Sequence, residues 1–224
     1  MEPDFRETKV KAVIFDFDGV ICNTEPLHAK SWQMLFARKG IHVPEERIWG
    51  AVGTPDYVFL QELFEEYRLN DSLQSWEVEK RNIFLLLLRQ NVPSFPGAVE
   101  LVRRLGWNWP LGIASTSWRV VIEFSLQRLG IRGCFQAIVG KEDVTEHKPS
   151  PEPYLRAAAD LGEEPQGCVA IEDSPAGITA ARAAGMPCIA VANSFPPDKL
   201  PAADLVVPSL EQADAVIAFL LGHE

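Results

Sequence analysis

Cysteine is scarce in this 224-residue sequence, and its spacing indicates neither a disulfide framework nor a zinc site. The four cysteines form no C-x-x-C pair and have no histidine cluster beside them. Two of them, Cys168 and Cys188, fall in stretches that we predict to be strands. Free cysteines commonly pack as small apolar side chains, so the pattern predicts reduced core cysteines. This usage is expected of a cytoplasmic protein.

Long apolar runs and excess positive charge are also missing. The longest aliphatic cluster, residues 83–88, is far shorter than the roughly 20 residues needed to cross a bilayer. The first 11 residues mix acidic and basic side chains and contain no apolar signal region. Acidic residues outnumber basic ones by 31 to 21, which gives a formal net charge of −10. We therefore expect no nucleic-acid partner and no membrane association, and a phosphate site would have to be made positive locally.

The sequence does contain a regular alternation of short apolar strands with helical patterns. Strands are predicted at residues 11–16, 111–114, 137–139, 168–171, 188–192 and 205–207. Such alternation predicts right-handed βαβ units, and hence an α/β fold with a parallel sheet covered on both faces. Residues 26–91 instead show helical spacing throughout and no convincing buried strand. We therefore predict a core formed by residues 1–25 and 92–224, and a helical insert at residues 26–91.

Two carboxylates stand at the end of the first predicted strand. Apolar residues 12–15 lead directly into Asp16-Phe17-Asp18-Gly19. Alternation along an extended chain puts Asp16 and Asp18 on the same side, and Gly19 lets the backbone turn away. A carboxylate is costly to bury alone, so we expect this pair in the crevice at the carboxyl ends of the strands, where a metal or ligand has access. The ordinary alternative is a solvated acidic turn.

Other predicted strands also end in polar residues. Ser115 and Ser117 follow one strand, Glu172 and Asp173 follow another, and the loop after a third contains Lys148. Taken singly, each of these has an ordinary explanation, as helix caps, a surface lysine or a solvated loop before a helix. In a parallel sheet, however, all of them reach the same edge as the first carboxylates. Carboxylate oxygens suit Mg²⁺, and a lysine beside them can stabilise phosphoryl charge, so together they indicate phosphoryl chemistry.

These residues resemble the motifs of the haloacid dehalogenase superfamily over nearly the whole chain. Asp16-Phe17-Asp18-Gly19-Val20 looks like its first motif, Ser115 its second, Lys148 its third, and Glu172-Asp173-Ser174-Pro175-Ala176-Gly177 its fourth. The insert, which begins near Thr24-Glu25-Pro26-Leu27-His28, is similar to the cap of the branch containing β-phosphoglucomutase and phosphoglycolate-type phosphatases. The resemblance implies a Rossmann-like core with a small α-helical cap domain.

The resemblance also implies a mechanism and a role for each motif residue. Asp16 would attack phosphorus and form an aspartyl-phosphate, while Asp18 would act as general acid and then general base. Ser115 and Lys148 would bind the phosphoryl oxygens. Mg²⁺ would be held by Asp16, Asp18, Asp173 and, directly or indirectly, Glu172. An aspartate at position 18 favours phosphate esters, because an alkoxide leaving group needs a proton. The expected substrate is a small phosphorylated metabolite.

The residues that would recognise the rest of this substrate are expected mostly in the cap and after the second strand. They are Thr24, His28, Gly53, Lys80, Arg81, Thr116, Ser117 and Arg119. Relatives that act as hexose-phosphate mutases carry a cap arginine where this chain has Asp56, which disfavours a second phosphate. A mutase therefore remains the alternative enzyme, and a non-catalytic phosphoacceptor or binding module the alternative class. We expect a monomer or a weak homodimer.

Overall fold

The computed structural model describes residues 8–51 and 56–222, which form two compact units. The first unit, the α/β core, contains residues 8–23 and 93–222, and the second, the helical unit, contains residues 24–92. Gly53, one of the expected substrate-binding residues, lies outside the described residues.

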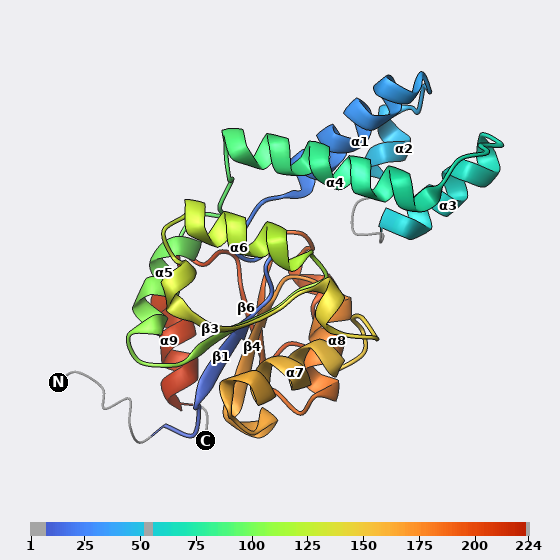
Figure 1. Ribbon diagram of the computed structural model, residues 1–224. Helices are drawn as coiled ribbons and strands as arrows, with labels where there is room; N and C mark the ends of the chain where they lie inside the picture. The colour runs from blue at the N-terminus through green and yellow to red at the C-terminus, as the bar shows by residue number, and fades with distance from the viewer. Residues whose placement is uncertain (1–7, 52–55, 223–224) are drawn as a thin grey trace. The chain divides into compact units, whose positions relative to one another are not determined.

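The core is built on a six-stranded sheet in which every neighbouring pair is parallel (Figure 1). The strand order is β3-β2-β1-β4-β5-β6, so the first strand lies between the second and the fourth. The strands are β1 Ala12–Phe15, β2 Leu111–Ala114, β3 Phe135–Val139, β4 Cys168–Glu172, β5 Cys188–Val191 and β6 Leu205–Val207. Strands β1, β2, β4 and β5 are buried along their whole length, as expected for a parallel sheet covered on both faces. The predicted α/β fold is confirmed.

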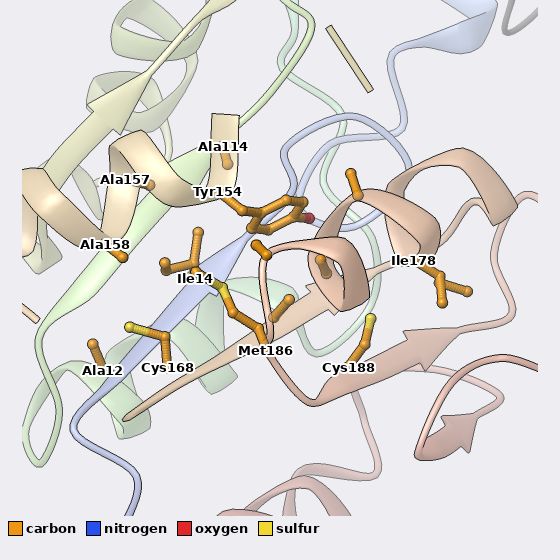
Figure 2. Close-up of a cluster of buried hydrophobic side chains, with 14 of the residues drawn as sticks. Ala12, Ile14, Ala114, Tyr154, Ala157, Ala158, Cys168, Ile178, Met186 and Cys188 are labelled. Carbon is orange, nitrogen blue, oxygen red and sulfur yellow. The ribbon is translucent and has the colours of Figure 1, made fainter. Parts of the chain in front are cut away.

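Helices connect these strands and cover the sheet. Helices α7 and α8 lie on one face, and α5 and α9 lie on the other (Figure 1). The core helices are α5 Ala98–Gly106, α6 Arg119–Arg128, α7 Glu152–Leu161, α8 Pro175–Ala183 and α9 Ala213–Gly222, with short 3₁₀ turns at Arg132–Cys134, Lys141–Asp143, Pro165–Gly167 and Pro197–Lys199. Under α7 and α8, small apolar side chains pack with Ile14, Met186 and Tyr154 (Figure 2). Cys168 and Cys188 belong to this cluster as free thiols.

The described residues of the helical unit form four helices around a core of their own. They are α1 Glu25–Lys39, α2 Glu45–Trp49, α3 Asp56–Glu66 and α4 Leu73–Gln90. Its core is rich in aromatic rings: Trp32 stacks on Phe36, and Phe59 meets both rings edge-on. Gly40 ends α1 in the left-handed conformation that glycine adopts readily. Within residues 24–51 and 56–92 there is no strand. In the part of the chain that the structure describes, every helix is too short or too polar to cross a membrane.

Candidate active site

The carboxyl ends of the central strands bring the predicted motif residues together in the core. Asp16 directly follows β1, Ser115 follows β2, and Glu172 is the last residue of β4. Lys148, from the loop after β3, places its Nζ 2.9 Å from Asp16 Oδ1 and 2.5 Å from Glu172 Oε1. Carboxylate oxygens of Asp16, Glu172 and Asp173 all lie within 4.8 Å of one another. Parallel pairing of β1 with β4 produces this convergence.

The charges in this cluster are unbalanced. Burial raises the pKa of Asp16 well above its usual value; Lys148 opposes the shift, while nearby carboxylates add to it. Burial likewise raises the pKa of Asp173 to about 7, with Glu172 contributing. For Lys148, burial would lower the pKa, but the carboxylates of Asp16 and Glu172 outweigh it and raise the pKa. Lys148 thus faces three buried carboxylates, and an added cation would relieve their repulsion.

The donor set fits a hard divalent cation. Carboxylate and carbonyl oxygens are the ligands that Mg²⁺ takes in proteins, usually together with several waters. Asp16 and Asp173 have carboxylates that converge here. The geometry agrees with this: both side chains are buried beside Glu172. Burial raises the pKa of each, and the neighbouring carboxylates add to the shift.

Asp18 is held by the loop after β2. The Ser117 hydroxyl donates to Asp18 Oδ2 over 2.6 Å, and the Ser117 amide donates to the hydroxyl oxygen of buried Ser115 over 3.0 Å. The two serines therefore form a connection between the β2 loop and the β1 loop. Thr116, between them, is exposed. Asp18 itself is partly exposed, which leaves its carboxyl accessible for proton transfer.

Close packing at Gly19 fixes the turn that follows Asp18. Gly19 has φ +81°, and a Cβ at this position would lie 1.8 Å from Asp173 Oδ2. Only a glycine therefore lets the β1 loop and Asp173 approach each other. The Gly19 carbonyl accepts a 2.7 Å hydrogen bond from Asn193 Nδ2, and Ser194 hydrogen bonds to Asp173. The loop after β5 thus supports both the turn and a candidate metal ligand.

Glu172 is fully buried, and donors surround its carboxylate. Oε1 accepts hydrogen bonds from Lys148 and from the Tyr154 hydroxyl, the latter over 2.7 Å. Oε2 accepts from the Asp173 and Ser174 amides and from the Ser174 hydroxyl. Burial and the charges of Glu172 and Asp16 raise the pKa of Tyr154 well above its usual value, so its hydroxyl stays protonated and donates. In this arrangement Glu172 anchors Lys148.

Arg119 lies at the start of α6 and is tied to a neighbouring loop. Its guanidinium forms an ion pair with Asp143 at 2.9 Å, and its amide donates to the Glu142 carboxylate. The side chain is 40% exposed. It therefore links the β2 and β3 loops on the core, whereas a direct contact with substrate stays a prediction.

The expected site residues of the helical unit include a buried charged cluster. Lys80 Nζ lies 2.9 and 3.0 Å from the two Asp56 oxygens and 2.6 Å from His28 Nδ1. The Lys80 side chain is only 2% exposed, and its ammonium also faces the rings of Trp32 and Phe84. Burial and the Lys80 charge lower the pKa of His28 to about 3, so the imidazole is neutral. Two further residues of the helical unit are expected to bind substrate: Thr24 is fully buried, and Arg81 is partly exposed.

Comparison with known proteins gives the family. The model of the haloacid dehalogenase-like hydrolases matches residues 13–191, well over half of the chain. The chain belongs to this family. The resemblance seen in the motifs is therefore confirmed, and haloacid dehalogenase-like hydrolases generally use a divalent metal, in keeping with the buried acidic cluster.

Individual relatives cover most of the chain. Fructose-1-phosphate phosphatase YqaB of Escherichia coli (strain K12) is 32% identical over 179 residues, which is 80% of this chain and 95% of the relative. The phosphorylated carbohydrates phosphatase of Thermotoga maritima is 33% identical and covers 79% of this chain and 82% of its own length. The crystal structure of β-phosphoglucomutase from Clostridium difficile is similar with a TM-score of 0.80 and 28% identity, covering 96% of this chain and 98% of that chain.

Some residues at this candidate site were not predicted from the sequence. Asn193 and Ser194 follow β5, so the rule that polar residues after a strand reach the site would have found them. Ser174 stood within the fourth motif without an assigned role. Tyr154 carried no signal, because a single tyrosine on the apolar face of a helix resembles an ordinary core residue.

Proposed function

We propose that this chain is a magnesium-dependent phosphatase that hydrolyses a small sugar phosphate or a similar phosphomonoester. The observation that carries the proposal is the Asp16 carboxylate, held 2.9 Å from Lys148 Nζ beside Asp173, with Asp18 two residues further along the chain. A nucleophilic carboxylate and a second carboxyl for proton transfer are the groups that a two-step phosphate transfer needs. Several related proteins are named as phosphatases, two of them of phosphorylated sugars.

In the proposed reaction, an Asp16 carboxylate oxygen attacks phosphorus and the bond from phosphorus to the ester oxygen breaks. Asp18 gives its proton to the departing alkoxide. The same carboxylate then takes a proton from water, whose oxygen attacks the aspartyl-phosphate and releases inorganic phosphate, which restores Asp16. The Ser117 hydroxyl, 2.6 Å from Asp18 Oδ2, would orient this acid and base.

Lys148 and Ser115 would bind the oxygens of the transferred group. Attack by one anion on another needs positive charge nearby. Lys148 supplies it at Asp16, with an ammonium whose raised pKa keeps it charged. Asp16, Asp173 and the Asp18 carbonyl would hold Mg²⁺, which when bound adds positive charge beside the phosphoryl group.

A hexose-phosphate mutase is the alternative, because the solved structures that are similar to this chain include a β-phosphoglucomutase. A mutase has to hold a second phosphate. In the helical unit, both oxygens of Asp56 pair with Lys80, so this cluster has no spare positive charge. That pairing favours hydrolysis. Recognition of the substrate by His28 and Lys80 stays a prediction.

The test is phosphate release from a panel of phosphorylated metabolites with Mg²⁺. The panel includes fructose 1-phosphate, and β-glucose 1-phosphate with a bisphosphate primer. Asp16→Asn is the decisive variant. Asp160→Asn is its matched control, because Asp160 is an exposed residue of α7 paired with Arg156.

We expect release from one or a few esters, lost in Asp16→Asn and kept in Asp160→Asn. Formation of glucose 6-phosphate with little free phosphate would identify a mutase. Hydrolysis that survives in Asp16→Asn would refute the assignment of the nucleophile. Absence of turnover on every ester would favour a binding module.

A further inference from the structure

Tyr154 is a polar side chain in an otherwise apolar cluster. It is the largest fully buried side chain among the described residues and belongs to the cluster formed by α7, α8 and the sheet. Figure 2 shows its ring among small apolar neighbours, with the hydroxyl oxygen in red. Phenylalanine would fill the same space without a polar atom to satisfy, so a buried tyrosine here needs a reason for its hydroxyl.

The hydroxyl and the ring contact two different members of the active-site network. The hydroxyl donates to Glu172 Oε1 over 2.7 Å. The face of the ring lies 5.0 Å from Lys148 Nζ, within the range of a cation–π contact. Lys148 in turn bonds the same Oε1 and Asp16 Oδ1. Tyr154 therefore touches both the lysine and the carboxylate that anchors it.

We propose that Tyr154 is a positioning residue, which holds the Glu172 carboxylate and the Lys148 ammonium in line with Asp16. Its effect on catalysis rests on the proposed phosphatase function, whereas its effect on Lys148 does not. Glu172 Oε2 is fixed by the donors of residues 173 and 174 at the start of α8. Oε1, by contrast, accepts from two side chains among the described residues, Lys148 and Tyr154. Without the Tyr154 hydroxyl, Glu172 Oε1 loses one of these donors and becomes more mobile, and the Lys148 ammonium moves with it.

The first measurement follows the Lys148 ammonium in the metal-free protein. A buried ammonium with several hydrogen bonds exchanges its protons slowly and gives its own ¹H–¹⁵N signal, assigned through its loss in Lys148→Met. We expect Tyr154→Phe to shift and broaden this signal. Ile178→Val, which removes a methyl group from the same cluster, should leave it in place, although we expect both variants to lower the unfolding temperature. An unchanged Lys148 signal in Tyr154→Phe would overturn the proposal, whether or not the protein hydrolyses any ester.

The second measurement is steady-state kinetics. Mutation of a residue that orients a metal ligand through a hydrogen bond typically lowers activity 10- to 100-fold. By the same reasoning, we expect the kcat of Tyr154→Phe to fall about tenfold and its KM to change less than about threefold. In a Glu172→Gln background, the same substitution should cost less than about twofold, because the hydroxyl acts through Glu172. A full tenfold loss in that background would refute this route. Ile178→Val should keep the wild-type kcat.

Discussion

The replacement of Gly177 by alanine tests whether the anchored Glu172 carboxylate is a rigid part of the site. Gly177 lies in the first turn of α8, and its amide donates to the Ser174 hydroxyl. A Cβ at Gly177 would lie 1.8 Å from Glu172 Oε1 and 1.9 Å from its Cδ. No real Cβ approaches this closely, so the carboxylate has to leave the position where its donors hold it.

Helix propensity and packing predict opposite signs for this substitution. Alanine is favoured over glycine inside a helix by about 1 kcal/mol. Overpacking costs about 1–3 kcal/mol, and each hydrogen bond lost to a buried charged acceptor costs about 1.5–3 kcal/mol. If the displaced carboxylate loses one of its bonds, the net result is a destabilisation of about 3 kcal/mol.

The assay is urea unfolding followed by far-UV circular dichroism, with Gly106→Ala as the matched control. Gly106 is also helical, at the end of α5, but its nearest neighbour to an added Cβ is 3.4 Å away, which is an ordinary contact. Gly106→Ala should be unchanged or stabilised by up to about 1 kcal/mol. If Gly177→Ala is as stable as Gly106→Ala, Glu172 is free to move and the reasoning is wrong.

Other predictions concern pH, metal and the helical unit. Burial raises the pKa of Asp173 from its ordinary 3.8 to about 7. The folded state therefore binds this proton more tightly than the unfolded state does. The stability that protonation of Asp173 contributes is fully present below pH 4 and is lost as the pH rises through 7. In EDTA, the melting temperature of the wild-type protein should therefore fall between pH 5 and pH 8, and that of Asp173→Asn should fall less steeply. Equal slopes for the two proteins would contradict this prediction. Mg²⁺ should raise the melting temperature more at pH 8 than at pH 5, because protons compete for its ligands, and equal shifts would argue against a carboxylate site. Asp56→Ala leaves the Lys80 ammonium buried without its carboxylate partner, and we expect the free energy of unfolding to fall by about 2 kcal/mol. This is less than the roughly 3–5 kcal/mol that is usual for buried pairs, because the Asp56 side chain is 30% exposed. Adding Lys80→Met should recover most of that loss in urea unfolding, and a double variant no more stable than Asp56→Ala would refute the pairing argument.

The sequence by itself determined the fold class and the family. Local patterns were enough: apolar strands such as β1 are recognisable from a few consecutive residues, and the parallel arrangement follows from their alternation with helices. The parallel arrangement also predicts that the residues after β1, β2 and β4 lie at the same edge of the sheet. Lys148 Nζ does lie 2.9 Å from Asp16 Oδ1, and carboxylates that are far apart in the sequence do converge there. Their catalytic roles remain proposals.

Only the tertiary structure decided the partners of each side chain. The strand order that puts β1 between β2 and β4 is not written in any one strand. The bond from Ser117 to Asp18 joins residues 99 positions apart, and the contact of Tyr154 with Glu172 depends on how α7 packs against the sheet. The spacing of apolar residues shows which side of a helix or strand is buried, because residues close together in the sequence determine that spacing. Which distant atoms then meet depends on how the elements pack together, and that information is spread over the whole chain.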